Sequence, residues 1–451
     1  MSSRKTYLLC TLAAALSIGA HAAHARTLTV GTCTGANPNF STIQSAIDVA
    51  FPGDKVQVCP GTYQEQVVIN RALTLANVKG QDSPTIAVPN GGVQQNTTTL
   101  GGSAAAAQIL VQPSSGDVTV TGLTVDGNGN NVQTCGLQLI GIYFRNAGGT
   151  ISKNAVKNQL LPEGYQGCQS GLGIYVQNAN AGVDPVNITS NTVTNFDKNG
   201  ITMNEANATG SITKNTVVGL GPTDVIAQNG IEVAFGANAD IESNNVSNLI
   251  YTPETYGSSG ILLYGTDQST SVLNRNTVNS AQYGIVMEDV NGTSTNLVPV
   301  TGNKVSNSAF AGVGLYSLGG SNDWINVASN TIQNTTEFDG IDACSNNNTI
   351  TGNKVTSSYE AAIHLDGLCD SPSGTGNTVT GNKITIACVG ILSGPSDPNA
   401  NTIGTNKYAD VQQQIVYGSD SASCSGAVRV PPRHQRSHKH KGLPVAVRPV
   451  R

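Results

Sequence analysis

The residues best suited to chemistry in this chain lie in two short segments in which apolar and polar residues alternate. Residues 340–344 read Gly-Ile-Asp-Ala-Cys, and residues 362–366 read Ala-Ile-His-Leu-Asp. Alternate side chains of a strand share one face, and paired strands lie ~4.8 Å apart. If the two segments pair side by side, Asp342 and His364 become neighbours and Asp366 shares their face. Such a cluster predicts acid–base chemistry, because crowded carboxyls separate their pKa values and one can stay protonated.

The spacing of the two carboxyls favours chemistry on a sugar. One strand spacing and one two-residue step separate Asp342 from Asp366, or ~8 Å between Cα atoms. That value falls within the ~6.5–9.5 Å that separates the carboxyl pair of inverting glycosidases. His364 offers a general base as an alternative, and Asp339 and Glu360 lie just upstream in the same segments. We therefore take Asp342, His364 and Asp366 as the catalytic candidates.

Three further residues are expected on the same face. They are Tyr264, Glu288 and Tyr316, and the two tyrosine rings could stack against pyranose rings. A Ca²⁺ site built from Asp342, Asp366 and Glu288 stays open as an alternative; otherwise no metal or cofactor is expected. A plain solvated strand face would also place polar residues at these positions.

The elements that must position these residues are internal repeats, which we sought first. A unit that reads Gly-Ile/Val-x-apolar-x recurs every 22 to 32 residues, starting at Gly141, Gly173, Gly200, Gly230, Gly260, Gly284, Gly312, Gly340, Ala362 and Gly390. A second unit, Asn-x-Val/Ile, falls between these, at Asn154, Asn191, Asn215, Asn244, Asn276, Asn303, Asn330, Asn353 and Asn382. Each unit alternates with period two, as a strand with one buried face does.

Stacked parallel strands explain this pattern best. A single unit cannot bury its own apolar face, so it must lie on the next, and the coil formed is an all-β, right-handed, single-stranded parallel β-helix. The repeated Asn is expected to form a ladder of side-chain amides, and the opening Gly is expected at a corner with positive φ. An antiparallel sandwich would need regular hairpin turns, and a helical solenoid would need 3.6-residue periodicity.

Both ends of the solenoid have the features of caps. Phe40, Ile43 and Ile47 have helical spacing, and Ser41 with Gln44 predicts a capping box, so a short helix is expected to cover the N-terminal edge. Residues 408–424 are expected to close the other end. Residues 425–451 form a basic, Pro-rich tail for which we expect no fixed structure.

The N-terminus and the cysteines predict export. Residues 1–25 combine two basic residues, an apolar run and A-x-A cleavage patterns, as a signal peptide does, which leaves residues 26–424 as the β-helix domain. Eight cysteines remain, and an oxidising compartment favours disulfides. Since a solenoid contacts its sequence neighbours, we expect Cys33–Cys59, Cys135–Cys168, Cys344–Cys369 and Cys388–Cys424. No C-x-x-C pair suggests a metal site. We expect a secreted or periplasmic protein.

The charge of the chain limits its partners. Residues 26–425 carry 14 Lys and Arg against 28 Asp and Glu, which gives about −14. An acidic body argues against a nucleic-acid partner. No later apolar run approaches the ~20 residues that a membrane span requires, so no stable membrane insertion is expected.

The N-terminal motifs carry a resemblance to a known family. Residues 40–47 read Phe-Ser-Thr-Ile-Gln-Ser-Ala-Ile, followed by Gly-Asp-Lys-Val at 53–56 and Pro-Gly-Thr-Tyr at 60–63. These resemble the opening of pectate-lyase-like β-helix proteins, and the later repeats resemble NosD-type parallel β-helix repeats. The resemblance implies the fold. It implies no single activity, since the superfamily includes lyases, hydrolases, esterases, epimerases and non-enzymes, and the motifs typical of its pectin methylesterases, polygalacturonases and alginate epimerases are absent from the sequence.

Two functions are therefore expected from the sequence. The first is an exported β-helix that binds, and in its catalytic form processes, a polysaccharide or cell-envelope glycan along its outward strand face. As an enzyme it would be a polysaccharide lyase or a glycoside hydrolase. The second is a non-catalytic structural or adhesin-like solenoid at the cell surface.

Overall fold

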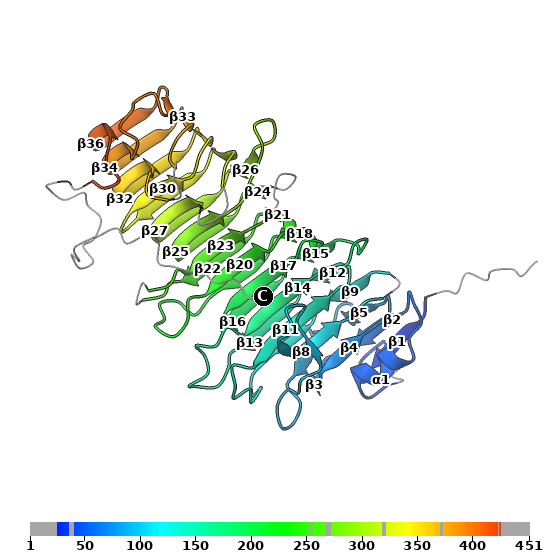
Figure 1. Cartoon of the computed structure of the whole chain (residues 1–451). Helices are drawn as coiled ribbons and strands as arrows, with labels where there is room; N and C mark the ends of the chain where they lie inside the picture. The colour runs from blue at the N-terminus through cyan, green and yellow to red at the C-terminus, as the bar shows by residue number, and fades with distance from the viewer. Residues whose placement is uncertain are drawn as a thin grey trace, which may run out of the picture.

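The chain coils into one elongated solenoid of stacked strands with a short helix near its N-terminal end (Figure 1). The computed structural model describes residues 25–35, 40–114, 116–252, 255–266, 272–317, 322–369, 373–422 and 424. Apart from residue 25, the predicted signal peptide lies outside these residues, as does the predicted tail at 425–451. Within them, every pairing between strands is parallel except that of β7 with β8. The predicted all-β parallel β-helix is confirmed.

Two sheets run the length of the solenoid. The first is a file of 14 strands: β1 (Thr27–Val30), β2 (Lys55–Val58), β5 (Thr74–Asn77), β9 (Val118–Thr121), β12 (Gly149–Ser152), β15 (Val186–Thr189), β18 (Thr209–Thr213), β21 (Asn238–Glu242), β24 (Leu273–Asn274), β26 (Val298–Thr301), β28 (Ile325–Ala328), β31 (Thr349–Thr351), β33 (Thr378–Thr380) and β35 (Thr402–Ile403).

The second sheet has 22 strands, because each coil enters it twice until the later coils merge the two passes into longer strands. Its members are β3 (Thr62–Gln64), β4 (Val67–Ile69), β6 (Thr85–Ala87), β7 (Thr97–Thr98), β8 (Ala104–Val111), β10 (Thr124–Asp126), β11 (Leu137–Arg145), β13 (Ala155–Gln159), β14 (Leu172–Gln177), β16 (Thr192–Phe196), β17 (Asn199–Asn204), β19 (Thr216–Val218), β20 (Asn229–Ala234), β22 (Asn245–Leu249), β23 (Ser259–Tyr264), β25 (Thr277–Glu288), β27 (Lys304–Tyr316), β29 (Thr331–Thr335), β30 (Asp339–Cys344), β32 (Lys354–Leu365), β34 (Lys383–Ser393) and β36 (Lys407–Tyr417).

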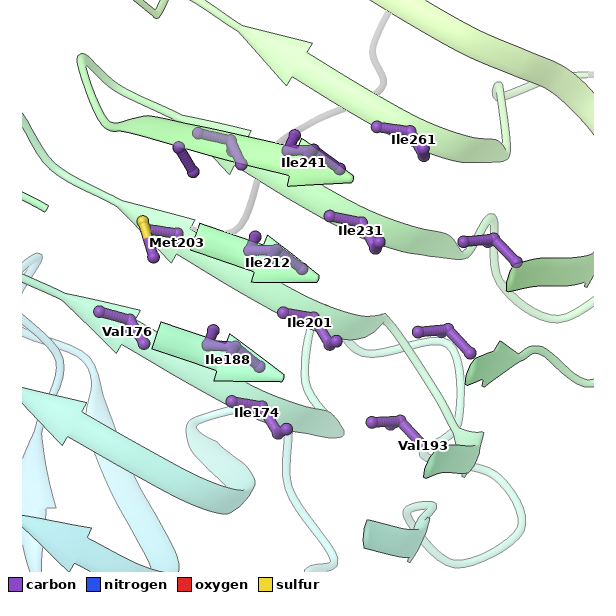
Figure 2. Close-up of a cluster of buried hydrophobic side chains, with 14 of the residues drawn as sticks. Ile174, Val176, Ile188, Val193, Ile201, Met203, Ile212, Ile231, Ile241 and Ile261 are labelled. Atoms are coloured by element: carbon purple, nitrogen blue, oxygen red, sulfur yellow. The ribbon is translucent and has the colours of Figure 1, made fainter. Parts of the chain in front are cut away.

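The core is a set of stacked aliphatic columns inside the coil. The residue after each repeat glycine pairs with its counterpart on the next coil, for example Ile174 with Ile201 and Ile201 with Ile231. Figure 2 shows these side chains stacked above one another, opposite Ile188 and Ile212 of the first sheet. All five are fully buried, so each coil contributes its apolar face to one continuous core.

The predicted asparagine ladder is confirmed and extends to Asn406. Each Nδ2 donates to Oδ1 of the next ladder asparagine at 2.9–3.1 Å. Asn276 also accepts the backbone N–H of Asn244 at 3.0 Å and donates to the carbonyl oxygen of Ile241 at 2.8 Å. The ladder therefore satisfies backbone groups at the corner of each coil as well as its own amides.

The expected role of the repeat glycines is wrong. The eight from Gly141 to Gly340 do not adopt positive φ. They are needed for close approach, since a Cβ on Gly230 would collide with Cγ1 of Val246 and lie 2.6 Å from the carbonyl oxygen of Gly260. Positive φ instead falls on the residue before each ladder asparagine from Asn154 to Asn382, namely Lys153, Ser190, Lys214, Ser243, Arg275, Gly302, Ser329, Gly352 and Gly381.

The N-terminal cap is present with a different first turn. Helix α1 (Ile43–Asp48) has Thr42, and not Ser41, as its N-cap, and Thr42 accepts the N–H of Ser45. The carboxylate of Glu65 accepts the N–H groups of Ile43 and Gln44. A side chain from a later coil, Glu65, thus satisfies the first amides of the helix. The predicted capping box would have satisfied these amides only in part, with side chains of the helix itself. No helix among the described residues is long and apolar enough to cross a membrane.

All four predicted disulfides are present: Cys33–Cys59, Cys135–Cys168, Cys344–Cys369 and Cys388–Cys424. Their sequence separations run from 25 to 36 residues. Three of them fit the interval of one coil, and the fourth holds a segment that follows the last described strand.

On the second sheet, the side chains that alternate with the core residues form columns on the outer face of the coil. These outward columns are more buried than a solvated face would be. Tyr143 and Tyr175 lie in register and stack with ring centroids 5.1 Å apart, and neither ring is exposed. The segment around residues 96–100 covers this part of the face. Within it, the N–H of Leu100 donates to Gln177 at 2.9 Å, and Thr98 accepts a hydrogen bond from Arg145.

Candidate acid–histidine site

The structure places the predicted catalytic candidates side by side. Strands β30 and β32 pair in parallel, with Asp342 in register with His364. Asp366 follows β32 directly, and its backbone N–H donates to the carbonyl oxygen of Ala343 on the preceding coil. The expected neighbours are therefore neighbours, although their chemical roles stay predictions.

Asp339 is the partner that holds His364. Its Oδ2 lies 3.1 Å from Nδ1 of the imidazole, and its Oδ1 accepts the N–H of Ala361 at 2.8 Å. The ladder between β30 and β32 has only two residue pairs, and β32 shifts its register against β34 just before Ala361. Asp339 and His364 are almost fully buried, so this contact is shielded from water.

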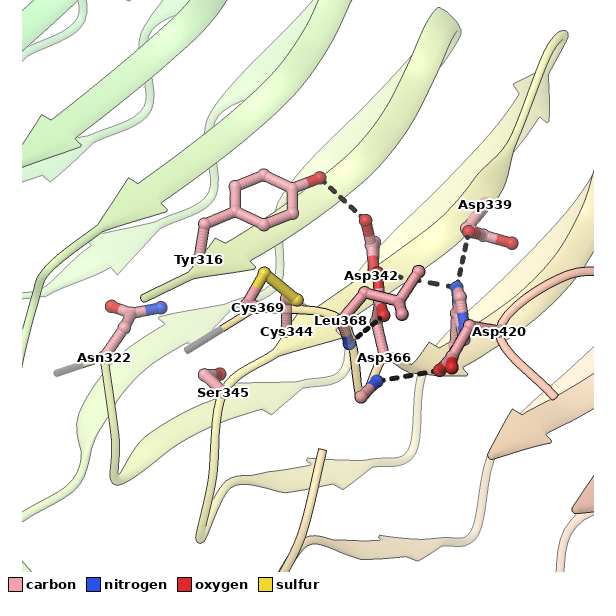
Figure 3. The surroundings of a disulfide bond; sticks show 12 residues. Tyr316, Asn322, Asp339, Asp342, Cys344, Ser345, Asp366, Leu368, Cys369 and Asp420 are labelled. Atoms are coloured by element: carbon pink, nitrogen blue, oxygen red, sulfur yellow. Dashed lines mark hydrogen bonds and ion pairs between the residues drawn. A yellow bond between two sulfur atoms is a disulfide. The ribbon is translucent and has the colours of Figure 1, made fainter. Parts of the chain in front are cut away.

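Tyr316 is the partner that holds Asp342. Its hydroxyl donates to Oδ2 of Asp342 at 2.9 Å (Figure 3). The ring crosses the position of Gly314, where a Cβ would lie 2.6 Å from the tyrosine oxygen. Gly314 is in register with Asp342. A glycine in the outward column thus leaves room for an aromatic ring to reach the carboxyl of the next coil.

Asp420 is a site residue that sequence reasoning missed. It lies beyond β36, and its Oδ1 accepts the N–H of Gly367 at 2.8 Å and lies 3.9 Å from Nε2 of His364. Nothing in the repeat pattern points to it, because it belongs to no repeat. The predicted Cys388–Cys424 bond could have indicated it, because that bond brings the segment after β36, which contains Asp420, back to the face of β34.

Glu360 borders the cluster on the same side. Its Oε1 accepts the N–H of Ala422 at 2.6 Å. Burial, followed by the charge of Asp339, raises its pKa to about 7. Glu360 therefore titrates near neutral pH, unlike an exposed glutamate.

Burial and charge set the protonation of the two central groups. Burial and the charge of Asp366 raise the pKa of Asp342 well above its usual range. Burial acts to lower the pKa of His364, but the carboxylates of Asp339, Asp420 and Asp342 outweigh it and raise that pKa well above 6.5. Burial and the neighbouring acid thus favour the protonated form of Asp342, and the surrounding carboxylates favour the protonated form of His364.

Solvent reaches this cluster at two carboxyls. The side chain of Asp342 is 16% exposed and that of Asp420 is 23% exposed, whereas that of His364 is 1% exposed. Oδ1 of Asp342 and Nε2 of His364 are buried and have no hydrogen-bond partner. Solvent therefore reaches part of the Asp342 side chain, whereas its Oδ1 lies inside the cluster, 3.8 Å from Nδ1 of His364.

The predicted substrate-binding residues lie on the preceding coils. Tyr264, Glu288 and Tyr316 stand in register in that order. Tyr316 is buried and packs edge-on against Tyr283, so the structure makes it a partner of Asp342 and gives it no free ring face for a sugar. Tyr264 remains partly exposed. Burial, followed by the charge of Asp289, raises the pKa of Glu288 to about 7.

Two overlapping trios place their donor atoms close enough to share a metal ion. They are Asp339, Asp342 and His364, and His364, Asp366 and Asp420, with the atoms of each trio within 4.8 Å of one another. Both trios depend on the imidazole. The carboxylates of Asp339, Asp342 and Asp420 already contact the two ring nitrogens of His364 at 3.1–3.9 Å, so we assign both trios to proton chemistry.

Comparison with known proteins supports the architecture. The family described as "Right handed beta helix region" matches residues 140–326, in agreement with the predicted hand of the coil. No curated protein matches the sequence.

Among solved structures, the A-module of a mannuronan C-5 epimerase from Azotobacter vinelandii is 15% identical, with 85% of this chain and 95% of that chain covered and a TM-score of 0.43. An exopolygalacturonase from Thermotoga maritima is 12% identical, with 85% of this chain and 90% of that chain covered and a TM-score of 0.44. The catalytic unit of an α-1,3-glucanase from Streptomyces thermodiastaticus is 13% identical, with 90% of this chain and 71% of that chain covered and a TM-score of 0.46.

Proposed function

We propose that this protein is an exported β-helix enzyme that binds a polysaccharide along the second sheet and cleaves its glycosidic bonds by acid–base catalysis. One observation carries the proposal. A carboxyl that is held by a tyrosine hydroxyl, Asp342, lies 3.8 Å from a histidine that is itself held by a second carboxylate. Rigid strands present this constellation, as catalytic groups require.

Asp342 is the proton donor of the proposed reaction. It is the partly exposed carboxyl within the strands, and burial together with Asp366 favours its protonated form. Tyr316 occupies Oδ2 and Oδ1 is buried beside the imidazole, so the carboxyl turns toward solvent to pass its proton to a leaving-group oxygen. A carboxylic acid that stays protonated near neutral pH is what general acid catalysis of glycoside hydrolysis needs.

Asp366 is the second carboxyl of the pair. It follows β32 on the face that carries Asp342, and its Oδ1 accepts the N–H of Leu368 at 2.7 Å. Its role is to activate the attacking water. The carboxylates around His364 favour its protonated form, which has no free lone pair for a general base, so we give it the role of supplying positive charge between them.

Electrostatics favour an uncharged substrate and hydrolysis. Among the described residues, the charged neighbours of the His364 imidazole are Asp339, Asp342, Asp366, Asp420 and Glu360, without a Lys or Arg. A uronate polymer would be repelled by this cluster, and the elimination carried out by a lyase needs a cation at the uronate carboxylate. Between the two enzyme classes expected from the sequence, we therefore propose the glycoside hydrolase.

The four disulfides support the proposed export. All eight cysteines outside the predicted signal peptide are paired, and disulfides persist in oxidising compartments. With the predicted signal peptide, they support a secreted or periplasmic location.

A panel of polysaccharides tests the proposal. Purified protein is incubated with neutral polymers and with uronate polymers, and new reducing ends and unsaturated uronate products are measured separately. We expect reducing ends from a neutral polymer, a loss of at least 100-fold in Asp342→Asn, and no loss in the surface control Asp82→Asn. Unsaturated products would show a lyase instead. If no polymer yields a product but binding is retained, the protein is a structural or adhesin-like solenoid and the proposed hydrolysis is wrong.

A further inference from the structure

We infer that the segment after β36, residues 418–422 with Cys424, is a working part of the site and supplies Asp420 as the positioning residue for His364. We call it the return segment. This inference rests on the proposed function and deepens it, because it extends the same site to a part of the chain outside the repeats.

The return segment follows a fixed path over the face of β34. The N–H of Gly418 donates to the carbonyl oxygen of Ser393 at 2.8 Å, and the N–H of Ala422 donates to Glu360. Cys424 then forms the disulfide with Cys388. Ala422 and Cys424 pack against Ala361, Cys388, Val389 and Leu392. Asp420 is thus held between three attachment points.

Two glycines define the place of the Asp420 carboxylate, since Gly394 leaves the space and Gly367 donates the backbone amide. A Cβ on Gly394 would collide with Oδ1 of Asp420 and would lie 2.6 Å from the backbone nitrogen of Gly367. A Cβ on Gly367 would lie 3.4 Å from the same oxygen. The N–H of Gly367 donates to that oxygen at 2.8 Å. Both glycines follow strands of the second sheet, so the binding place for Asp420 is built into consecutive coils.

Asp420 gives the imidazole a second charged neighbour. Asp339 contacts Nδ1, whereas Oδ1 of Asp420 faces Nε2 at 3.9 Å. That nitrogen is buried and has no hydrogen-bond partner. The ring therefore lies between two carboxylates that approach it from opposite edges. The other charged groups near the ring are Asp342, Asp366 and Glu360, all acidic.

This geometry acts against the effect of burial on the protonation of the ring. Burial alone would favour the neutral imidazole, and the contact with Asp420 acts in the opposite direction. If Asp420 moves away, His364 holds its proton less tightly, and the positive charge beside Asp342 is lost at a lower pH. The Cys388–Cys424 bond keeps Asp420 in place, so reduction of this bond is expected to have the same effect as loss of the carboxylate.

Three variants test the inference in the full-length oxidised protein. Asp420→Asn removes the charge, Gly394→Ala displaces the carboxylate, and Cys388→Ser with Cys424→Ser releases the return segment. The matched controls are Gly136→Ala, where a Cβ meets only Thr134 at 3.4 Å, and Cys33→Ser with Cys59→Ser at the opposite end of the solenoid. Circular dichroism and thermal unfolding establish that each variant is folded.

The first measurement is an NMR titration of the His364 imidazole, which needs no activity. We expect its midpoint to fall by at least one pH unit in each of the three variants and to stay unchanged in both controls. The second is hydrolysis, which should fall at least tenfold with a shifted pH profile. An unchanged His364 titration in Asp420→Asn overturns the inference. If the wild type hydrolyses nothing but the titration shifts as expected, the proposed function fails and the positioning role of Asp420 stands.

Discussion

The hydroxyl of Tyr316 donates a 2.9 Å hydrogen bond to Oδ2 of Asp342, across a coil position at which Gly314 has no side chain. Both residues belong to the second sheet, and Gly314 and Asp342 are in register. This contact ties the proposed proton donor to the aromatic cluster formed by Tyr283 and Phe310. Tyr316 therefore controls both the position of the Asp342 carboxyl and its affinity for a proton.

Tyr316→Phe is expected to move the alkaline limb of activity to higher pH. The hydroxyl stabilises the ionised form of Asp342 and so lowers its pKa; without it Asp342 keeps its proton longer. A hydrogen bond to a charged group contributes roughly 1.5–3 kcal/mol, so the limb should move by about one to two pH units. The measurement is the pH profile of hydrolysis, with the exposed Tyr165→Phe as control. A limb that stays in place, or moves to lower pH, contradicts the role given to this contact.

Removal of divalent cations is expected to leave activity unchanged. The proposed reaction needs a protonated Asp342 and an ionised second carboxyl, and neither step uses a metal. Activity measured after EDTA treatment, and again with added Ca²⁺, should agree with that of the untreated enzyme. A loss in EDTA that Ca²⁺ restores would favour the calcium site at Asp342, Asp366 and Glu288 that the sequence left open.

The stability of the protein is expected to fall between about pH 5 and pH 7, in part because of Glu288. Burial, followed by the charge of Asp289, raises the pKa of Glu288 from 4.5 to about 7. The folded state therefore binds the proton more tightly than the unfolded state. The resulting stabilisation is complete below pH 4.5 and is lost as the pH rises through about 7. It amounts to about 3 kcal/mol at most.

Glu288→Gln removes this titration while it keeps the shape of the side chain. Its free energy of unfolding in urea should vary less between pH 5 and pH 8 than that of the wild type. Glu163→Gln, at an exposed turn, should follow the wild-type curve. A Glu288→Gln curve as steep as the wild-type one would mean that another group causes the dependence.

The register of the site could be predicted from the sequence because the repeat fixes it. Each Gly-Ile unit sets one strand, and a one-residue slip would turn its isoleucine out of the core. The neighbours Asp342 and His364 follow from that constraint alone. Three of the four disulfides follow from the same argument, since stacked coils bring cysteines one coil apart within reach.

The remaining features of the site lie where the repeat stops or is broken. Asp420 belongs to the return segment, and its approach to His364 depends on Gly394, Gly367 and a disulfide. The bond from Ala361 to Asp339 lies beside a shift in the register of β32 against β34. The positive φ expected for the repeat glycines failed for a related reason. The alternating pattern predicts on which face of the strand a side chain lies. It does not predict how closely the neighbouring coil approaches a glycine, and that approach is what requires glycine here.

The asparagine ladder is expected to contribute strongly to stability. In Asn276→Ala, the side-chain bonds to Asn244, Asn303 and the carbonyl oxygen of Ile241 are lost. The backbone N–H of Asn244 loses its acceptor as well. Each buried group left without a partner costs ~1–3 kcal/mol, so a loss of roughly 3 kcal/mol or more is expected in urea unfolding. Asn187→Ala, on an exposed position of β15 that accepts one bond from Ser211, should cost less than 1 kcal/mol.

The repeat glycines offer the sharpest test of how closely the coils pack. In Gly230→Ala the new methyl group would collide with Val246 and meet the carbonyl oxygen of Gly260 at 2.6 Å. Backbone on one side and a buried β-branched side chain on the other leave it little freedom to move. Overpacking of this kind costs ~1–3 kcal/mol, and thermal unfolding of Gly230→Ala and of Gly136→Ala would measure it. The coil that begins at Ala362 carries the methyl group naturally, beside a shift in the register of β32 against β34. A neutral Gly230→Ala would therefore mean that the coils can separate locally without such a shift, and that close approach is not why these positions are glycine.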